Sequence, residues 1–382
     1  MEKNNTPAVK FNFTNSRFVP DDASKGLFTF LILQTLVTLV YNVLYMVGLV
    51  QSIWSYVFTL ILDFCFVACV FNIAKTKKID VFANLKMKKA PSFKQVLICV
   101  GISVVCLFGF SALTNLFLEV LYSMGYESVT SDIVISNFGT YLMYVGLICI
   151  IPALCEEILF RGLICNGLKR LGSVVAIFGS AFLFMIMHGS PDQTIHQFIL
   201  GIVLAIVYLV SNNLWIPIII HFLNNFMAVT ISYIAYGDTA STATESVGMV
   251  FGEYLIYALI SALIAGAIIY VLIRALSRSY NAEKDVEPVE LKSITAPLQD
   301  GYISYTNYNY AQESTFGVQQ DLELNEMQNE SNSQNADVYV DPVFSIDENK
   351  MSGGGKAMLI ISIVWLAIDW ISALIIGFSG MY

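Results

Sequence analysis

A small set of ionisable and amide side chains stands out because each lies inside a strongly apolar stretch of the sequence. Glu156 and Glu157 are neighbours in the stretch CEEILFRG, and Arg161 follows four residues after Glu157. A glutamate four residues before an arginine can pair with it across one helical turn, whereas Glu156 points about 100° away and has no local partner. We therefore expect Glu156 to face a cavity, where a carboxylate can exchange protons with water or a substrate.

A histidine lies level with Glu156 if the segments on either side of the turn at Leu171 and Gly172 are helices. Glu156 precedes this turn by about 15 residues and His188 follows it by about 16, so both sit roughly 23–25 Å up an antiparallel hairpin. A carboxylate and an imidazole at one depth are suited to general acid–base chemistry. The spacing therefore predicts that Glu156 and His188 share a site.

A second histidine and an asparagine, His221 and Asn225, are four residues apart in the stretch IIIHFLNN. This spacing places them on one face of a helix. They lie about nine residues, or ~13 Å, beyond the preceding turn, which is about 10 Å short of the depth expected for Glu156 and His188. Bringing all four together requires the first hairpin to project into the cytoplasm at its tip.

Other polar residues in apolar stretches are expected to have structural roles. Asp63, Glu119 and Asp369 each stand alone, and His196 lies near the outer end of its segment. Ionisable groups inside a bilayer cost roughly 2.5–3.5 kcal/mol each on insertion scales, so we expect these four at helix contacts or span ends. The seven cysteines form no CxxC pair, which favours reduced, buried thiols over a zinc site or a disulfide framework.

Long apolar segments must position these residues. Of the 382 residues, 56% are hydrophobic and 13% are charged, well below the ~25% charge of an average soluble domain. Apolar runs of about 20 residues recur, each long enough to cross a ~30 Å hydrocarbon core. The fold class that this predicts is an all-α, polytopic transmembrane helical bundle. The spans are expected near residues 27–50, 54–74, 95–122, 139–165, 171–188, 195–211, 214–235, 251–275 and 357–378.

The composition separates an eight-span core from a ninth, C-terminal span. Residues 279–350 hold 14 acidic residues and 3 lysines, and this polar segment cannot bury enough apolar surface to fold alone. We therefore expect a disordered linker that carries the acidity of the chain, whose net charge of −9 offers no basic surface to nucleic acid. The predicted divisions are residues 1–26 (a segment without a cleavable signal peptide), 27–94 (two spans and a basic loop), 95–278 (the core), 279–356 (the acidic linker) and 357–382 (the last span).

Lysine and arginine residues predict the orientation of the spans. The loops at residues 51–53, 123–138, 189–194 and 236–250 contain neither residue type, whereas the alternate loops are basic. Positively charged loops remain in the cytoplasm. We expect an integral protein of the plasma membrane with a cytoplasmic N-terminus and linker, and with the C-terminus outside.

Three motifs occur in order in consecutive spans: EExxxR (Glu156, Glu157, Arg161), FxxxH (Phe184, His188) and HxxxN (His221, Asn225). Together, over roughly residues 95–235, they resemble the CAAX-protease and bacteriocin-processing (CPBP/Abi) family of intramembrane proteases, which is related to CAAX prenyl endopeptidases. The stretches FRGLI and LWIPIIIHFLNN are also similar to the family. The N-terminal spans, the linker and the ninth span lie outside the resemblance.

The resemblance implies an eight-span peptidase with a site sunk into the membrane. At the positions that match the family's motifs, the resemblance implies that Glu156 and His188 activate a water molecule, while His221 and Asn225 hold the oxyanion. Glu157 and Arg161 support the site. The implied partners are the lipid bilayer and a hydrophobic peptide or lipidated protein, since eukaryotic relatives process prenylated proteins and bacterial relatives are linked to bacteriocin immunity and processing.

A metal-dependent mechanism would use the same residues. Glu156, His188 and His221 could form a His₂Glu set for Zn²⁺ with one open position. The sequence lacks the HExxH spacing of zinc peptidases, in which two ligands and the base share one helix. We favour the metal-free mechanism and keep the zinc site as an alternative.

Two other classes of function use the same features. A non-catalytic immunity or partner-binding protein would use the linker and the ninth span to tether a partner. A proton-coupled transporter would use the buried groups as a relay, but the sequence shows none of the repeated halves of such carriers. An intramembrane endopeptidase is the preferred prediction.

Overall fold

The computed structural model describes residues 17–51, 54–87, 89–128, 135, 137–238, 251–285 and 350–380. Every regular element in these residues is a helix, so the protein is all-α. The structure groups Met1–Lys284 and Ile346–Tyr382 in one compact unit. The predicted N-terminal segment up to residue 16 and most of the predicted acidic linker lie outside the described residues.

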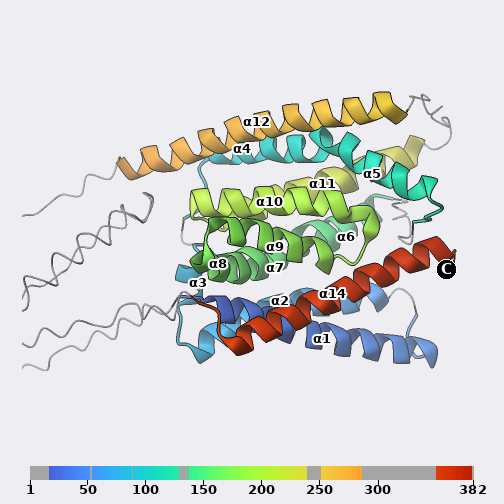
Figure 1. Cartoon of the computed structure of the whole chain (residues 1–382), viewed down its shortest axis with the longest axis horizontal. Helices are drawn as coiled ribbons and strands as arrows, with labels where there is room; N and C mark the ends of the chain where they lie inside the picture. The colour runs from blue at the N-terminus through green and yellow to red at the C-terminus, as the bar shows by residue number, and fades with distance from the viewer. Residues whose placement is uncertain are drawn as a thin grey trace, which may run out of the picture. The chain divides into compact units, whose positions relative to one another are not determined.

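Eight of the helices are long and apolar enough to cross a membrane, which makes the chain an integral membrane protein. They are Pro20–Met46, Ser55–Thr76, Phe93–Ser123, Phe138–Leu171, Pro191–Ser211, Trp215–Ala235, Gly252–Tyr280 and Gly353–Ser379. Figure 1 labels them by their α-helical parts. These are α1 (Pro20–Met46), α2 (Ser55–Thr76), α4 (Phe93–Val104), α5 (Ser111–Ser123), α6 (Phe138–Tyr144), α7 (Ile151–Glu157), α8 (Asn166–Leu168), α10 (Thr194–Ser211), α11 (Trp215–Asp238), α12 (Phe251–Asp285) and α14 (Gly353–Ser379).

The expected span at 171–188 is shorter than the others. It forms α9 (Ser173–Met187), a helix of 15 residues, which is about 22 Å long against a hydrocarbon core of ~30 Å. The helix before it, Phe138–Leu171, has 34 residues and a length of about 50 Å. Eight of the nine predicted spans therefore correspond to helices long enough to cross a membrane, whereas the span predicted at 171–188 corresponds to a shorter apolar helix.

Polar contacts join the helices at one end of the bundle, which we call the basic end. Lys77 Nζ lies 2.6 Å from Asp22 Oδ2, and Asn213 Nδ2 donates to the Lys89 carbonyl at 2.8 Å. Ser352 N donates to Asp21 Oδ1 at 2.9 Å, which sets the start of α14 beside the start of α1. The described lysines and arginines other than Arg161 fall in the segments that meet here: 17–25, 75–94, 169–170, 274–284 and 350–356.

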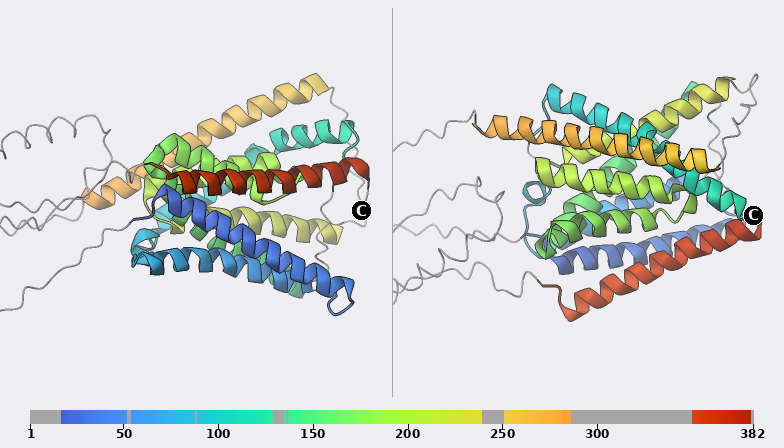
Figure 2. Two further views of the ribbon diagram at one scale, coloured as in Figure 1. Left: turned by 60° about the horizontal axis from the view of Figure 1, so that its bottom comes forward. Right: turned by 45° about the horizontal axis from the view of Figure 1, so that its top comes forward.

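The opposite end is held by a different set of contacts. Tyr126 Oη donates to Asp192 Oδ2 at 2.9 Å, and Glu127 N donates to the Gly377 carbonyl at 3.0 Å. Trp370 Nε1 donates to Thr194 Oγ1 at 2.9 Å. The described residues at this end include no lysine or arginine. In both views of Figure 2, α1 and α14 start at one end of the bundle and finish at the other.

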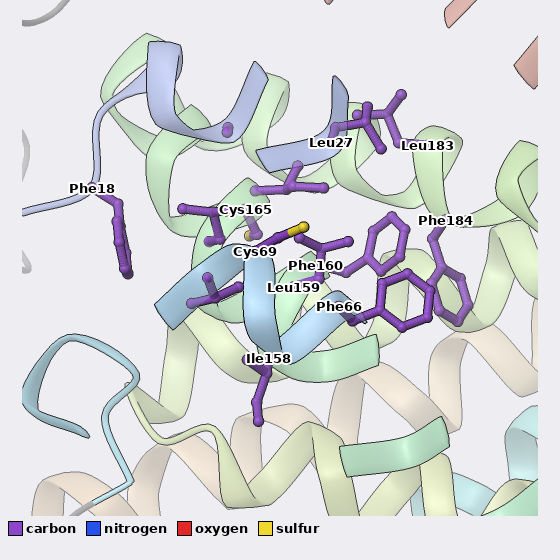
Figure 3. Close-up of a cluster of buried hydrophobic side chains, with 14 of the residues drawn as sticks. Phe18, Leu27, Phe66, Cys69, Ile158, Leu159, Phe160, Cys165, Leu183 and Phe184 are labelled. Atoms are coloured by element: carbon purple, nitrogen blue, oxygen red, sulfur yellow. The ribbon is translucent and has the colours of Figure 1, made fainter. Parts of the chain in front are cut away.

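The largest hydrophobic cluster surrounds the helix that carries the first motif. Figure 3 shows three phenylalanines packed together: Phe66 of α2, Phe160 of the helix Phe138–Leu171, and Phe184 of α9. The Phe66 and Phe160 ring centroids are 6.4 Å apart, and those of Phe160 and Phe184 are 5.1 Å apart. Because aromatic rings favour edge-to-face contacts, this cluster joins α2 and α9 to the helix Phe138–Leu171 beside the site.

Candidate active site

The helix that carries the first motif is irregular on both sides of α7. The π-helical segments η3 (Val145–Ile150) and η4 (Ile158–Cys165) flank it. Pro152 lies in the first turn of α7 and has no N–H to donate to the Ile148 carbonyl four residues earlier. Asn225 Nδ2 donates to that carbonyl instead, at 3.0 Å. Widened turns of this kind are frequent at functional sites.

A buried ion cluster lies at the end of α7. Arg161 Nη1 is 2.7 Å from Glu157 Oε1, which confirms the predicted ion pair. His221 Nδ1 is 2.9 Å from the same oxygen, and Arg161 Nη2 donates to the Gly201 carbonyl at 3.1 Å. The side chains of Glu157, Arg161 and His221 are at most 2% exposed. Since a carboxylate only accepts hydrogen bonds, His221 presents a protonated Nδ1 to Glu157.

The first and second motifs meet at a more open position. His188 Nε2 lies 4.0 Å from Glu156 Oε2, and the two side chains are 17% and 13% exposed. His188 Nδ1 contacts the Phe184 carbonyl at 2.7 Å, and a carbonyl accepts, so Nδ1 carries the proton and Nε2 is free to accept. Glu156 Oε2 has no hydrogen-bond partner among the described residues. Two acceptors at this separation can both bind one water molecule.

Phe184 explains why an aromatic residue precedes His188 by one turn. Its ring centroid is 4.7 Å from that of His188 and 5.7 Å from that of His221. The Arg161 guanidinium carbon lies 4.5 Å from the Phe184 ring centroid. One ring therefore separates the buried ion cluster from the open Glu156–His188 pair and packs against both.

The depth of His221 differs from the expectation. An offset of about 10 Å was predicted from the rise of a regular α-helix, yet His221 contacts Glu157 directly. The eight residues of η4 are π-helical, and their i→i+5 turns give a smaller rise per residue than α-helical turns. This shortening, which the sequence pattern did not predict, amounts to about 3 Å and accounts for only part of the offset.

The comparison with protein families selects the same part of the chain. Residues 138–227 match the model of the family described as "Type II CAAX prenyl endopeptidase Rce1-like". These residues form a domain of that family. No curated protein and no solved structure matches the chain.

The CAAX-protease-like domain runs from α6 into α11 and contains all three motifs. It is narrower than the resemblance over residues 95–235 that the motifs predicted. Helices α1, α2, α4, α5, α12 and α14 lie outside the matched residues and pack around them. The large hydrophobic cluster joins α1, α2 and α14 to the CAAX-protease-like domain.

The structure adds two polar residues to the surroundings of the site. His196, expected to be structural, lies with its Nε2 3.1 Å from Asn224 Nδ2. Asn224 is 3% exposed, and its Oδ1 has no partner among the described residues. The sequence signal that was missed is spacing, because Asn224 is three residues after His221 and shares its helix face.

The zinc alternative requires Glu156, His188 and His221 to converge as ligands. His221 directs Nδ1 to Glu157 and leaves Nε2 available, an arrangement that metal-binding histidines also show. Within the described residues, however, no group of three His, Cys, Asp or Glu side chains is arranged to hold a metal ion. The described side chains therefore do not assemble the predicted His₂Glu set, and no step of the mechanism is routed through a metal.

Proposed function

We propose that the CAAX-protease-like domain is an intramembrane endopeptidase. Its substrate is a membrane-associated protein or hydrophobic peptide, and a lipidated C-terminus is the substrate class that the family description suggests. The observation that supports this most directly is the pairing of Glu156 with His188, 4.0 Å apart and partly open, beside a sealed ion cluster.

The mechanism assigns water activation to the open pair. Glu156 takes one proton from a water molecule while the water oxygen forms a bond to the scissile carbonyl carbon, and His188 Nε2 accepts a hydrogen bond from the hydrogen that stays on that oxygen. The carbonyl π electrons move to oxygen. Glu156 then gives its proton to the amide nitrogen as the C–N bond breaks, so that the carboxylate is restored.

The mechanism assigns oxyanion binding to the third motif. Glu157 accepts from His221 Nδ1, and His221 donates to the oxyanion from Nε2 in its doubly protonated form, in which both ring nitrogens are donors. Asn225 uses one amide hydrogen on the Ile148 carbonyl and retains the second. Removing one oxyanion donor costs about 10²–10³ in kcat, so both residues are testable.

We also propose that the basic end faces the cytoplasm. The segregation of lysine and arginine to one end of the described bundle supports this, since positive loops are retained inside. The starts of α1 and α14 are then cytoplasmic, and the end of α14 lies outside.

The deciding experiment is peptide cleavage by the purified, detergent-solubilised protein, read by mass spectrometry. The substrates are hydrophobic peptides with and without a farnesylated C-terminal cysteine, and a strong chelator is added in parallel. We expect wild type to cleave, and Glu156→Gln to lose at least ~10²-fold in rate because the base is removed. Glu119→Gln is the matched control, because Glu119 is an exposed carboxylate on α5.

Three outcomes separate the alternatives. Equal rates for wild type and Glu156→Gln would contradict the peptidase. Loss of the wild-type activity on chelation would favour the zinc mechanism over the metal-free one. If the protein protects cells against a bacteriocin and the Glu156→Gln variant protects them equally well, the non-catalytic immunity or partner-binding function would be supported instead.

A further inference from the structure

Asp63 is a carboxylate in the middle of α2 that the motifs do not include. It is 4% exposed, so α2 places it inside the bundle. Its Oδ2 has no hydrogen-bond partner among the described residues. A buried carboxylate without a partner is costly, and such a residue inside a membrane span is a functional candidate.

The packing register places Asp63 level with Glu156. Helix α2 and the helix Phe138–Leu171 run in the same direction, since both finish at the basic end, through the Lys77–Asp22 pair and the Asn166–Asn84 contact. Phe66 touches Phe160 at a centroid distance of 6.4 Å. Asp63 precedes Phe66 by about one turn, and Glu156 precedes Phe160 by about one turn. Both carboxyl groups therefore lie one turn away from the Phe66–Phe160 contact, at the same depth in the interface between the two helices.

Charge interactions agree with this placement. Asp63 interacts electrostatically with both Glu156 and its neighbour Cys155. Asp63 Oδ2 is without a hydrogen-bond partner among the described residues. Arg161, the one fully buried arginine of the described residues, is already shared by Glu157 and the Gly201 carbonyl.

We propose that Asp63 is a positioning residue for Glu156, with one proton shared between their carboxyl groups. Two carboxylates in one site of low dielectric do not both ionise, and the retained proton joins them. This hydrogen bond engages the other oxygen of the Glu156 carboxyl, so that Oε2, which lies 4.0 Å from His188 Nε2, faces the water. Asp63 keeps the shared proton throughout, and the proton that moves in hydrolysis passes from water to Glu156 and then to the leaving nitrogen.

The inference rests on the proposed peptidase activity, and substitutions at position 63 test it. Asp63→Asn retains a hydrogen-bond donor of the same size, whereas Asp63→Leu removes the donor. We expect Asp63→Leu to lower kcat by roughly 10–100-fold with KM within about twofold, and Asp63→Asn to stay within about fivefold of the wild-type kcat. Asp369→Leu, which replaces an exposed carboxylate on α14, is the matched control and should be unchanged.

Two kinetic results would overturn the inference. One is a wild-type kcat for Asp63→Leu. The other is an Asp63→Asn variant as slow as Asp63→Leu, because the ionised form rather than a hydrogen-bond donor would then be needed. Each variant must elute as a single detergent-solubilised species with the wild-type melting temperature.

A spectroscopic readout keeps the test independent of cleavage. A shared proton gives a carboxylic-acid C=O band in the infrared spectrum. We expect Asp63→Asn and Glu156→Gln each to shift or remove this band, and Asp369→Leu to leave it in place. A band unaffected by either site substitution would refute the shared proton even if no substrate is cleaved, whereas absent cleavage with an altered band would count against the peptidase alone.

Discussion

Arg161 shows how single residues stabilise the site. Its side chain is completely buried, and its guanidinium contacts the Glu157 carboxylate, the Gly201 carbonyl and the face of Phe184. A charge in a low-dielectric interior is tolerated only when it is paired and hydrogen-bonded. Arg161 thus links the first motif to the second through Phe184, and Glu157 links it to the third through His221.

Arg161→Met is expected to destabilise the protein by about 3–5 kcal/mol, because it leaves the Glu157 carboxylate buried with only His221 as a partner. The measurement is the unfolding transition of the detergent-solubilised protein. Arg274→Met is the control, since Arg274 is exposed on α12 and lies 5.9 Å from the Tyr270 ring. Equal stability of the two variants would contradict the role given to the ion cluster.

At the scale of elements, the site depends on a proline that interrupts a helix. Pro152 leaves the Ile148 carbonyl without its α-helical donor, and α11 supplies the Asn225 amide in its place. The interruption coincides with the π-helical segment η3. Asn225 thereby ties α11 to the irregular helix, in addition to any contact with substrate.

Asn225→Leu is expected to cost about 1–3 kcal/mol of stability, because the Ile148 carbonyl loses its donor. Pro152→Ala restores a backbone N–H, so the same substitution should cost less in the Pro152→Ala background. The unfolding midpoints of wild type, Asn225→Leu, Pro152→Ala and the double variant form a double-mutant cycle. Additive effects would show that the two residues do not share this carbonyl.

The same four proteins separate the two roles of Asn225. If Asn225 also binds the oxyanion, the double variant regains stability but not cleavage. Recovery of both would assign Asn225 to the helix contact alone.

At the scale of the whole molecule, charge is distributed unevenly between the two ends of the bundle. The described basic residues other than Arg161 gather at the end where α1 and α14 begin. The opposite end is joined through tyrosine, tryptophan and aspartate contacts. This asymmetry is the basis of the proposed orientation.

Cysteine labelling in intact cells tests the orientation. Ala90 is exposed at the basic end and Glu127 is exposed at the opposite end. We expect Glu127→Cys to react with a membrane-impermeant maleimide from outside and Ala90→Cys to react only after lysis. The native cysteines are buried or half-buried, so the wild-type protein provides the background, and the reverse labelling pattern would overturn the orientation.

Several features followed from the sequence alone because they depend on local spacing. The Glu157–Arg161 pair is four residues apart, and the meeting of Glu156 with His188 follows from counting residues on either side of one turn. The long apolar helices and the order of the three motifs are likewise local properties. The family domain over residues 138–227 lies within the part of the chain that these motifs indicated.

Only the tertiary structure decided which faces of the helices meet. His221 on Glu157, Gly201 on Arg161 and Asn224 on His196 are contacts between distant segments. In a membrane protein, the lipid-facing and buried sides of a helix are similarly apolar, so no polar face reveals the rotation of each helix. Side-chain packing and the satisfaction of buried polar groups set that rotation, and they act only once the helices are assembled.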